Sequence, residues 1–287
     1  MVTSAKSISE ISARLESHLR SLIGPRDPYL GKAKHQLAQQ YIQEELGCWG
    51  QVSAQSFFSQ GQEHFNWSLT VLGSQPQLAP ILVGAHYDTV PGSPGADDNT
   101  SGLAVLLVLA ELLAHAQPRR SVHLVAFDLE EYGLVGSTTC ARAWKAEGRP
   151  LHLMLSLEML GYFSDEARSQ KYPLPALSRL YPNTGNFIAL IGNASTIPKM
   201  LNLKRQLKKS GAPCQWLPVT SKGNSLPATR RSDHAPFWDE GYPAILITDT
   251  ADLRNPHYHK ASDRIETLNI KMIVNITRGL FNGLRLL

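Results

Sequence analysis

The chain has 287 residues, of which 43% are hydrophobic and 18% charged, and its formal net charge is +4. A chain of this length and composition folds around a large core and is neither disordered nor fibrous. The small positive charge predicts no nucleic-acid partner, because such proteins gather lysine and arginine on one face. Cys48, Cys140 and Cys214 are too widely spaced to predict a disulfide framework or a thiolate zinc site.

The termini and the apolar runs predict a cytoplasmic protein without a membrane association. The first residues carry Glu10 and Glu16 and lack the apolar stretch of a signal peptide. The longest apolar run, 103–110, ends at Glu111 and falls short of the ~20 residues that a membrane span requires. A monomer is the simplest expectation for the oligomeric state.

The hydrophobic pattern predicts alternating helices and strands. Apolar residues at helical spacing indicate two N-terminal helices within residues 1–50, at 8–22 and 33–46. Further predicted strands lie at 51–58, 67–72, 80–84, 122–127, 152–157, 187–191 and 244–248, and further helices at 102–116, 197–209 and 268–287. This alternation predicts an α/β fold, a three-layer sandwich in which helices flank a mixed, largely parallel sheet. We expect residues 1–287 to form a single catalytic domain.

Two stretches, 161–186 and 213–231, fit neither a helical nor a strand pattern. The first is rich in proline and aromatic residues, and the second in glycine, serine and proline. Loops of this length inside a domain usually carry function, so we expect both to be binding loops near the active site. Five aromatic residues of this region are equally compatible with packing and with a pocket wall, namely Tyr162, Phe163, Tyr172, Tyr181 and Trp216.

Ionisable side chains recur where the predicted strands end. The carboxyl edge of an open α/β sheet is where such folds bind ligands. The residues at or just after these ends, and in the segment before the last helix, are His86, Asp88, Asp98, Glu130, Glu131, Glu158, His257 and His259.

This set of side chains predicts a catalytic metal site. Histidine with carboxylate, and without cysteine, suits Zn²⁺, Co²⁺ or Mn²⁺. Three buried carboxylates and a bridging hydroxide balance two divalent cations, whereas a single ion would leave a costly negative charge. Two metals ~3.5–4 Å apart are a known device for activating water.

The ordered motifs HYD, ADDNTSG, DLEEYG, SLEM, SDHAPF and YHKASD resemble those of the M28 family of dinuclear zinc peptidases, which includes bacterial aminopeptidases. The resemblance covers most of the chain and implies the zinc-peptidase, or phosphorylase/hydrolase-like, fold. It implies two Zn²⁺ ions bridged by Asp98, with His86 and Glu158 on one ion and Glu131 and His259 on the other. Only the resemblance selects His259 over its neighbour at position 257.

The same resemblance implies the roles of two further positions. Glu130 resembles the general base that takes a proton from a metal-bridged water, and Tyr258 resembles the phenol that stabilises the tetrahedral intermediate. Several aminopeptidases of the family carry aspartate where this chain has Glu158. Family members also carry a cis peptide bond after the bridging aspartate, here Asp98–Asn99.

Other polar residues near these motifs are expected to support the ligands. Asp88 stands where it can hold the second ring nitrogen of His86. Asp97, Thr100 and Ser101 are the candidate caps for the following helix. The Ser232-Asp233-His234 segment invites a serine-hydrolase reading, but adjacent residues do not form a catalytic triad and no GxSxG motif is present. We therefore expect this segment to support the metal ligands by contacting them without binding the metal itself.

We expect a zinc-dependent exopeptidase that removes residues from the amino end of a peptide substrate. A carboxypeptidase of the same family is one alternative, and it would need Arg230, Arg231 or Arg254 to bind the substrate carboxylate. A single-zinc acyltransferase resembling glutaminyl cyclase is another. A non-catalytic binding module on this fold is the third.

Overall fold

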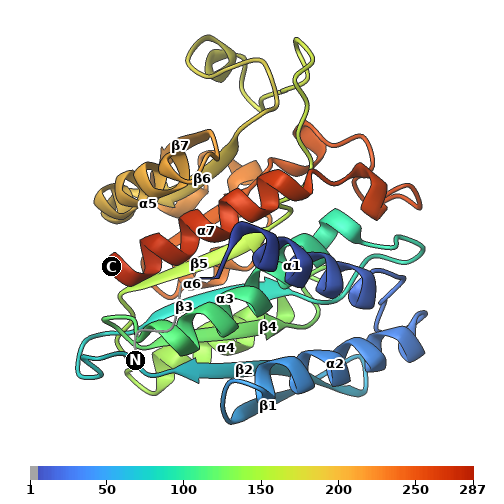
Figure 1. Ribbon diagram of the computed structural model, residues 1–287, viewed down its shortest axis with the longest axis vertical. Helices are drawn as coiled ribbons and strands as arrows, with labels where there is room; N and C mark the ends of the chain where they lie inside the picture. The colour runs from blue at the N-terminus through green and yellow to red at the C-terminus, as the bar shows by residue number, and fades with distance from the viewer. Residues whose placement is uncertain (1–5) are drawn as a thin grey trace.

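In the computed structural model, which describes residues 6–287, eight strands form one mixed sheet in the order β1-β2-β4-β3-β5-β8-β6-β7 (Figure 1). The strands are β1 Val52–Ser59, β2 Gln62–Val71, β3 Ile81–His86, β4 Val122–Phe127, β5 Leu153–Glu158, β6 Ile188–Asn193, β7 Cys214–Val219 and β8 Ala244–Thr248. The helices are α1 Ile8–Leu22, α2 Lys32–Gly47, α3 Gly102–Ala116, α4 Val135–Ala146, α5 Ile197–Lys209, α6 His234–Asp239 and α7 Ile270–Leu286.

The centre of the sheet is parallel and its margins are not. Strands β4, β3, β5 and β8 run parallel to one another. Strand β2 is antiparallel to both β1 and β4, and β6 with its parallel neighbour β7 is antiparallel to β8. This arrangement confirms the predicted α/β class with a mixed sheet. It also brings the carboxyl ends of four central strands to one edge.

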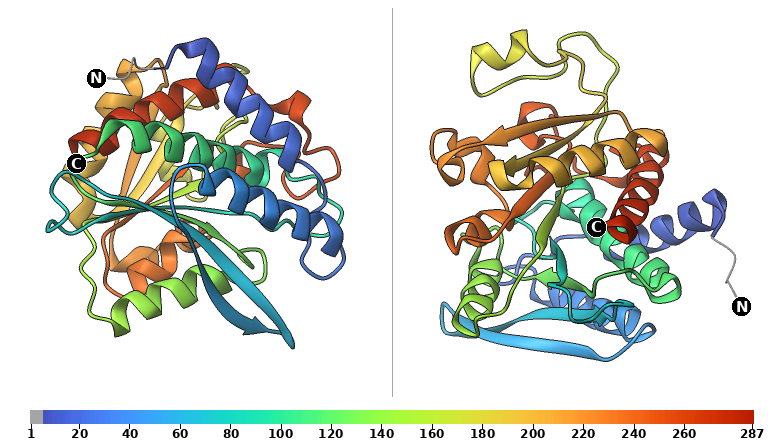
Figure 2. Two further views of the ribbon diagram at one scale, coloured as in Figure 1. Left: turned by 60° about the horizontal axis from the view of Figure 1, so that its bottom comes forward. Right: turned by 90° about the vertical axis from the view of Figure 1, so that its left-hand side faces the viewer.

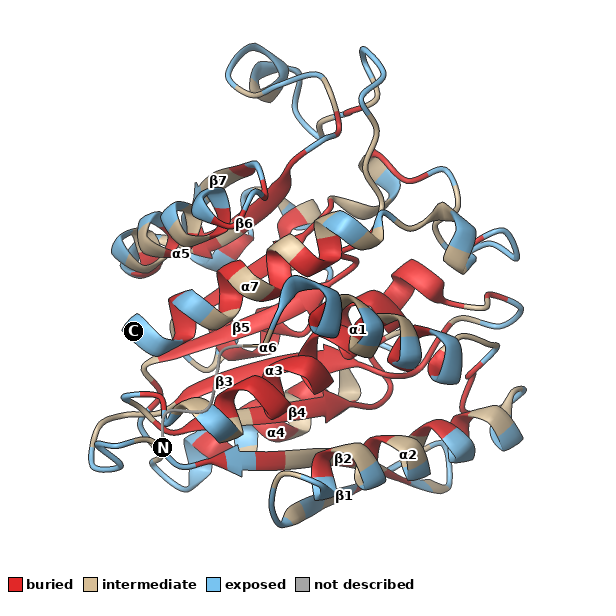
Figure 3. Ribbon diagram, in the orientation of Figure 1, coloured by how far each residue is buried: buried red, intermediate tan, exposed pale blue. Residues whose placement is uncertain are grey.

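Helices cover both faces of the sheet, as the three-layer prediction requires (Figure 2). Helices α1, α2, α3, α5 and α7 lie on one face, and the shorter α4 and α6 lie on the other. Each face of the sheet has its own hydrophobic core, and successive residues of a strand point into opposite cores. Val83 packs in the larger core beneath α3, and Leu82 packs in the smaller core beneath α4 and α6. The central strands are therefore buried on both sides (Figure 3).

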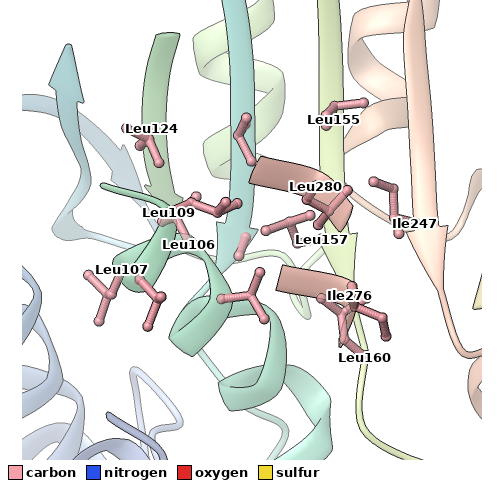
Figure 4. Packing of buried hydrophobic residues seen from close by; sticks show 14 of the residues in the cluster. Leu106, Leu107, Leu109, Leu124, Leu155, Leu157, Leu160, Ile247, Ile276 and Leu280 are labelled. Carbon is pink, nitrogen blue, oxygen red and sulfur yellow. The ribbon is translucent and has the colours of Figure 1, made fainter. Parts of the chain in front are cut away.

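Helix α3 lies at the centre of the larger core. Leu106 and Leu109 of this helix pack with Leu157 of β5 and Ile276 of α7 (Figure 4). Among the described residues, one helical stretch, Ala96–Ala116, is long and apolar enough by composition to cross a membrane, and 83% of its most apolar window is buried inside the protein. Its apolar surface is thus used for packing.

Three elements escaped the sequence-based prediction. Strand β7 occupies the start of 213–231, which was expected to be loop; it is an edge strand, where Pro218 is tolerated because one side needs no backbone partner. Helix α4 begins with a short run of glycine, serine and threonine, which are weak helix formers, and α6 has only six residues. The strand β2 starts earlier than predicted because it buries the polar His64 and Asn66, which hide the apolar alternation.

The segment 161–186 has no strand and carries one short 3₁₀ helix, Pro175–Arg179. It projects from the body of the protein at the top of the view and is largely exposed (Figures 1 and 3). Tyr181 anchors it, since the phenol donates a hydrogen bond of 2.9 Å to the carbonyl oxygen of Trp216 in β7.

We predict that Leu106→Ala lowers the free energy of unfolding by about 2–5 kcal/mol, because the side chain is fully buried and its truncation leaves a cavity. Leu37→Ala is the matched control, since Leu37 is also helical but 58% exposed, and its effect should stay within about 0.5 kcal/mol. Urea denaturation followed by circular dichroism measures both. Equal losses for the two variants would contradict the assignment of α3 to the core.

Candidate metal centre

Five predicted ligands converge at the carboxyl edge of the sheet. His86 and Glu158 are the last residues of the neighbouring strands β3 and β5. Glu131 lies in the turn after β4, Asp98 in the turn Ala96–Ser101 before α3, and His259 in the loop before α7. Strands that end side by side hold two ligands rigidly, while the turns bring in the other three.

The first group consists of His86, Asp98 and Glu158. His86 Nε2 lies 3.3 Å from Asp98 Oδ1 and 3.5 Å from Glu158 Oε1. This nitrogen is buried and has no hydrogen-bond partner, whereas Nδ1 of the same ring lies 3.2 Å from the carbonyl oxygen of Asp88. With its proton on Nδ1 and directed at that carbonyl, the ring would offer the Nε2 lone pair to a metal ion.

The second group consists of Asp98, Glu131 and His259. His259 Nε2 lies 3.1 Å from Asp98 Oδ2 and 3.2 Å from Glu131 Oε2. The two oxygens of Asp98 are thus divided between the groups. Glu131 Oε1 is buried without a partner, as His86 Nε2 is in the first group.

The spacing of these atoms fits metal coordination. A tetrahedral ion with nitrogen and oxygen ligands at about 2.0–2.1 Å keeps its ligand atoms about 3.3–3.4 Å apart. The four distances around the two groups, 3.3, 3.5, 3.1 and 3.2 Å, match this value. Each group can therefore hold one divalent ion, with Asp98 shared between the two.

Negative charge is crowded in this site. Burial raises the pKa of Glu130 well above its usual value, raises that of Glu131 to about 7 and also raises that of Glu158. Burial would raise the pKa of Asp98 too, but hydrogen bonds with His259 and His86 outweigh it and lower the pKa. The carboxylates compete for the same imidazoles, so bound cations would favour their ionised forms.

Glu130 lies beside both groups. One atom from each of His86, Glu130 and Glu131 forms a third set within 4.8 Å. Across residues 6–287, the Glu130 carboxylate has no ion-pair partner, in contrast to Glu131 with His259. Glu130 is therefore available to a substrate or a water molecule.

Tyr258 lies against the second group. Its ring stacks on His259 with the centroids 3.7 Å apart, and its phenol oxygen accepts a hydrogen bond of 3.0 Å from Arg231. Burial and the charge of Asp98 raise the pKa of the Tyr258 phenol, while Arg231 lowers it. The net shift is upward, so the phenol remains protonated at neutral pH and can donate a hydrogen bond.

Asp88 connects the two sides of the site. Its Oδ1 lies 3.3 Å from His86 Nδ1 and also accepts the backbone N–H of Glu130 at 3.1 Å. Its Oδ2 accepts the backbone N–H of Glu131, again at 3.1 Å. One carboxylate thus orients a ligand histidine and both glutamates of the turn.

The Ser232-Asp233-His234 segment has three different environments. Ser232 donates a hydrogen bond of 2.7 Å to Glu158 Oε2. Asp233 is buried with both carboxylate oxygens unpartnered, and burial raises its pKa to about 7. His234 is buried, with Nε2 2.7 Å from the carbonyl oxygen of Thr229.

None of the three candidate caps, Asp97, Thr100 and Ser101, makes a side-chain cap bond to α3. The carboxylate of Asp97 has other partners. Its Oδ1 accepts the backbone N–H of Gly161 at 2.8 Å, and its Oδ2 accepts the amide of Asn255 at 2.8 Å. The turn before α3 contains a cis peptide bond at Asp98–Asn99, as predicted. The carboxylate therefore joins two loops instead of closing a helix end.

Asp263 is a supporting residue that the sequence did not reveal. Its two oxygens accept the backbone N–H groups of Asp97 and Asp98, at 2.9 and 3.1 Å. The residue belongs to the YHKASD motif, which was the only available signal for it.

An apolar cleft of about 980 Å³, its open mouth included, adjoins the metal centre. Its wall includes Tyr172, Tyr181 and Trp216, whereas Phe163 packs against the larger core. Residues of 161–186 and of 213–231 line this cleft together with Asp98, Glu130, Glu131 and Glu158. Both long segments thus contribute to the surface that a bound substrate would meet.

The sequence matches the family described as Peptidase family M28 over residues 66–283. The uncharacterized protein YfbL of Escherichia coli (strain K12) is 40% identical over 211 residues, which cover 69% of this chain and 64% of YfbL. Aminopeptidase YwaD of Bacillus subtilis (strain 168) is 29% identical over 194 residues, which cover 66% of this chain and 37% of YwaD. The chain thus spans less than two thirds of the length of these relatives.

Solved structures share the fold at low sequence identity. LapB of Legionella pneumophila superposes with a TM-score of 0.70 at 18% identity, covering 96% of this chain and 71% of LapB. The glutaminyl cyclase of Porphyromonas gingivalis gives a TM-score of 0.71 at 18% identity, covering 98% and 99%. The family match spans most of the sequence, and the chain belongs to peptidase family M28.

We predict that Asp88→Asn lowers the affinity for Zn²⁺ by about 10–100-fold, because an amide has one acceptor oxygen and cannot hold both backbone N–H groups. Competition with a fluorescent chelator measures the affinity. Asp239→Asn is the control, since Asp239 is exposed and pairs with Arg230. Unchanged affinity in Asp88→Asn would refute the supporting role of this carboxylate.

Proposed function

We propose that the protein is a zinc-dependent aminopeptidase that holds two metal ions and hydrolyses the first peptide bond of substrates with a free amino end. The arrangement of Asp98 carries the proposal, since one of its oxygens faces His86 and Glu158 and the other faces Glu131 and His259. The relatives named as aminopeptidases and zinc metalloproteases support the metal and the direction of attack.

Each residue of the site then has a defined task. His86 and Glu158 would hold one ion, Glu131 and His259 the other, and Asp98 both. Bound zinc lowers the pKa of water and polarises the scissile carbonyl. Everything else in the reaction depends on side chains of this chain.

Glu130 is the proposed general base. Its buried carboxyl has a raised pKa, because desolvation disfavours its charge, and it has a free face toward the cleft. A base with a raised pKa takes the proton from the attacking water and then gives it to the departing amine. Tyr258 donates a hydrogen bond to the oxyanion that forms on the carbonyl oxygen.

The cleft favours a substrate with a cationic end and an apolar side chain. Its acidic lining residues are Asp98, Glu130, Glu131, Glu158 and Asp252, while Arg231 is the one basic residue among the described residues that line it. A substrate ammonium would meet a favourable field near the glutamates. The apolar walls then receive the first side chain, and we propose apolar amino-terminal residues as the preferred class.

The carboxypeptidase alternative needs a free cation for the substrate carboxylate. Arg254 is buried and donates to Gln170 and to the carbonyl oxygen of Phe187. Arg230 pairs with Asp239, and neither arginine lines the cleft in the described part of the chain. Arg231 lines it but is paired with Asp252. The observed pairing therefore favours attack from the amino end.

A single-zinc cyclase needs one metal group, whereas two complete ligand groups converge here. The second group supports a hydrolase over a glutaminyl-cyclase-like acyltransferase. The complete ligand set and the free Glu130 likewise oppose a purely non-catalytic binding module. The cytoplasmic location and the monomeric state stay predictions.

We predict that Glu130→Gln keeps both zinc ions while kcat falls by about 10²–10⁴-fold, because the amide cannot accept a proton. Glu131→Gln is the matched neighbour, and it should lose zinc because its carboxylate contacts His259. Elemental analysis and anilide hydrolysis measure the two properties. Wild-type turnover by a fully metallated Glu130→Gln variant would exclude Glu130 as the base.

The direction of attack is tested with a matched set of substrates. We expect hydrolysis of leucine and phenylalanine anilides, no hydrolysis of their N-acetyl forms, loss of activity with a chelator and recovery with Zn²⁺. A peptide with amino-terminal glutamine, assayed for ammonia release, tests the cyclase alternative. Cleavage of N-blocked peptides from the carboxyl end, or cyclisation without hydrolysis, would overturn the proposal.

A further inference from the structure

Arg231 occupies an unusual place at the mouth of the cleft. It precedes Ser232, which contacts the ligand Glu158, and it follows Arg230, which points elsewhere and pairs with Asp239. Its side chain is 47% exposed, yet both terminal nitrogens of its guanidinium are engaged by protein groups. Those two bonds determine what the residue can do.

The Arg231 guanidinium bonds to Asp252 on one side and to Tyr258, the proposed hydrogen-bond donor to the oxyanion, on the other. Nη1 donates a hydrogen bond of 2.8 Å to Asp252 Oδ1, which fixes the orientation of the planar group. Nη2 donates to the phenol oxygen of Tyr258 at 3.0 Å, and the guanidinium carbon lies 5.6 Å from the ring centroid. Arg231 therefore contacts Tyr258 at its phenol oxygen.

This contact determines which way the phenol hydrogen points. A phenol has one hydrogen to donate and accepts through its oxygen. Because Arg231 occupies an acceptor position of the Tyr258 oxygen, the hydrogen of that phenol is free for another acceptor. The stacking of the ring on His259 fixes the tyrosine beside the metal centre.

We propose that Arg231 is a positioning residue that holds the Tyr258 phenol as a hydrogen-bond donor toward the oxyanion of the tetrahedral intermediate. This inference rests on the proposed function. The cationic donor also polarises the phenol, which strengthens the hydrogen bond that Tyr258 gives. Through Tyr258, Arg231 thus stabilises the transition state more than it stabilises the bound substrate.

Direct capture of a substrate carboxylate by Arg231 is the competing role. The pairing with Asp252 neutralises much of the cation, and both terminal nitrogens already donate. A substrate carboxylate would find only the three remaining N–H groups, on a cation whose charge Asp252 already neutralises. The geometry therefore favours the action through Tyr258.

A double-mutant cycle on the zinc-loaded full chain separates the two roles. The variants are Arg231→Gln, Tyr258→Phe and the double variant, assayed with leucine anilide, which carries no carboxylate. We expect Arg231→Gln to lower kcat by about 10-fold or more with KM nearly unchanged, since hydrogen bonds from charged groups have effects of this size. In the Tyr258→Phe background the same change should have little further effect, and Arg231→Lys should recover part of the loss.

A second measurement does not depend on turnover. A phosphonamidate dipeptide mimics the tetrahedral anion, and calorimetry reports its affinity for the zinc-loaded protein. We expect Arg231→Gln to weaken this binding about 10-fold when Tyr258 is present and to leave it unchanged in Tyr258→Phe. Zinc content and thermal melting should match the wild type in all variants.

Arg230→Gln is the matched control, because it removes the neighbouring guanidinium that bonds to Asp239 and to the carbonyl oxygen of Lys222. Its kinetics should equal those of the wild type. Additive losses in the cycle would overturn the inference, as would a rise in KM confined to substrates with a free carboxylate. A wild type without anilide hydrolysis would instead refute the proposed function, and the phosphonamidate binding would still test the contact.

Discussion

The organisation of the site depends on one carboxylate that is shared between two groups of candidate ligands. Asp98 presents one oxygen to His86 and the other to His259, at 3.3 and 3.1 Å. Such sharing requires the Asp98 backbone to be fixed. Asp263 holds its N–H, and the side chain of Asn99 accepts the N–H groups of Gly102 and Met159 at 3.2 and 3.1 Å. The turn is thereby tied to α3 and to the end of β5.

Buried aspartates connect the segments around the candidate ligands, because each accepts hydrogen bonds from more than one loop. Asp97 and Asp249 are adjacent and buried, and burial together with Asp97 raises the pKa of Asp249 well above its usual value. A proton retained by this pair removes one buried charge. Asp249 also accepts the backbone N–H of Tyr162 at 3.1 Å, so the same pair anchors the start of the projecting segment 161–186. Asp97 and Asp249 thus hold in place both the wall of the cleft and the turn that carries Asp98.

The sequence was sufficient to predict the features that follow from local patterns. Alternating apolar residues indicated most strands, and the polar residues at their ends indicated side chains that the fold brings together. The supports escaped prediction because their partners are distant in sequence: Asp263 bonds to Asp98 across 165 positions. Strand β7 was missed because an edge strand with Pro218 lacks the apolar run of a central strand. Pairing across long distances leaves no periodic signal in a single chain.

The N-terminal segment shows how far such supports extend beyond the family match. Arg26 is fully buried and lies outside residues 66–283, yet its guanidinium donates to the carbonyl oxygens of Tyr87, Pro94 and Gly95, between His86 and Asp98. Burial lowers its pKa to about 10, partly offset by Asp88 and Asp263. A cation at this position stabilises both the loop that joins two ligands and the carboxylates that orient them. The connection between α1 and α2, which carries Arg26, is therefore part of the framework of the candidate metal centre, and the matched region alone would lack this cation.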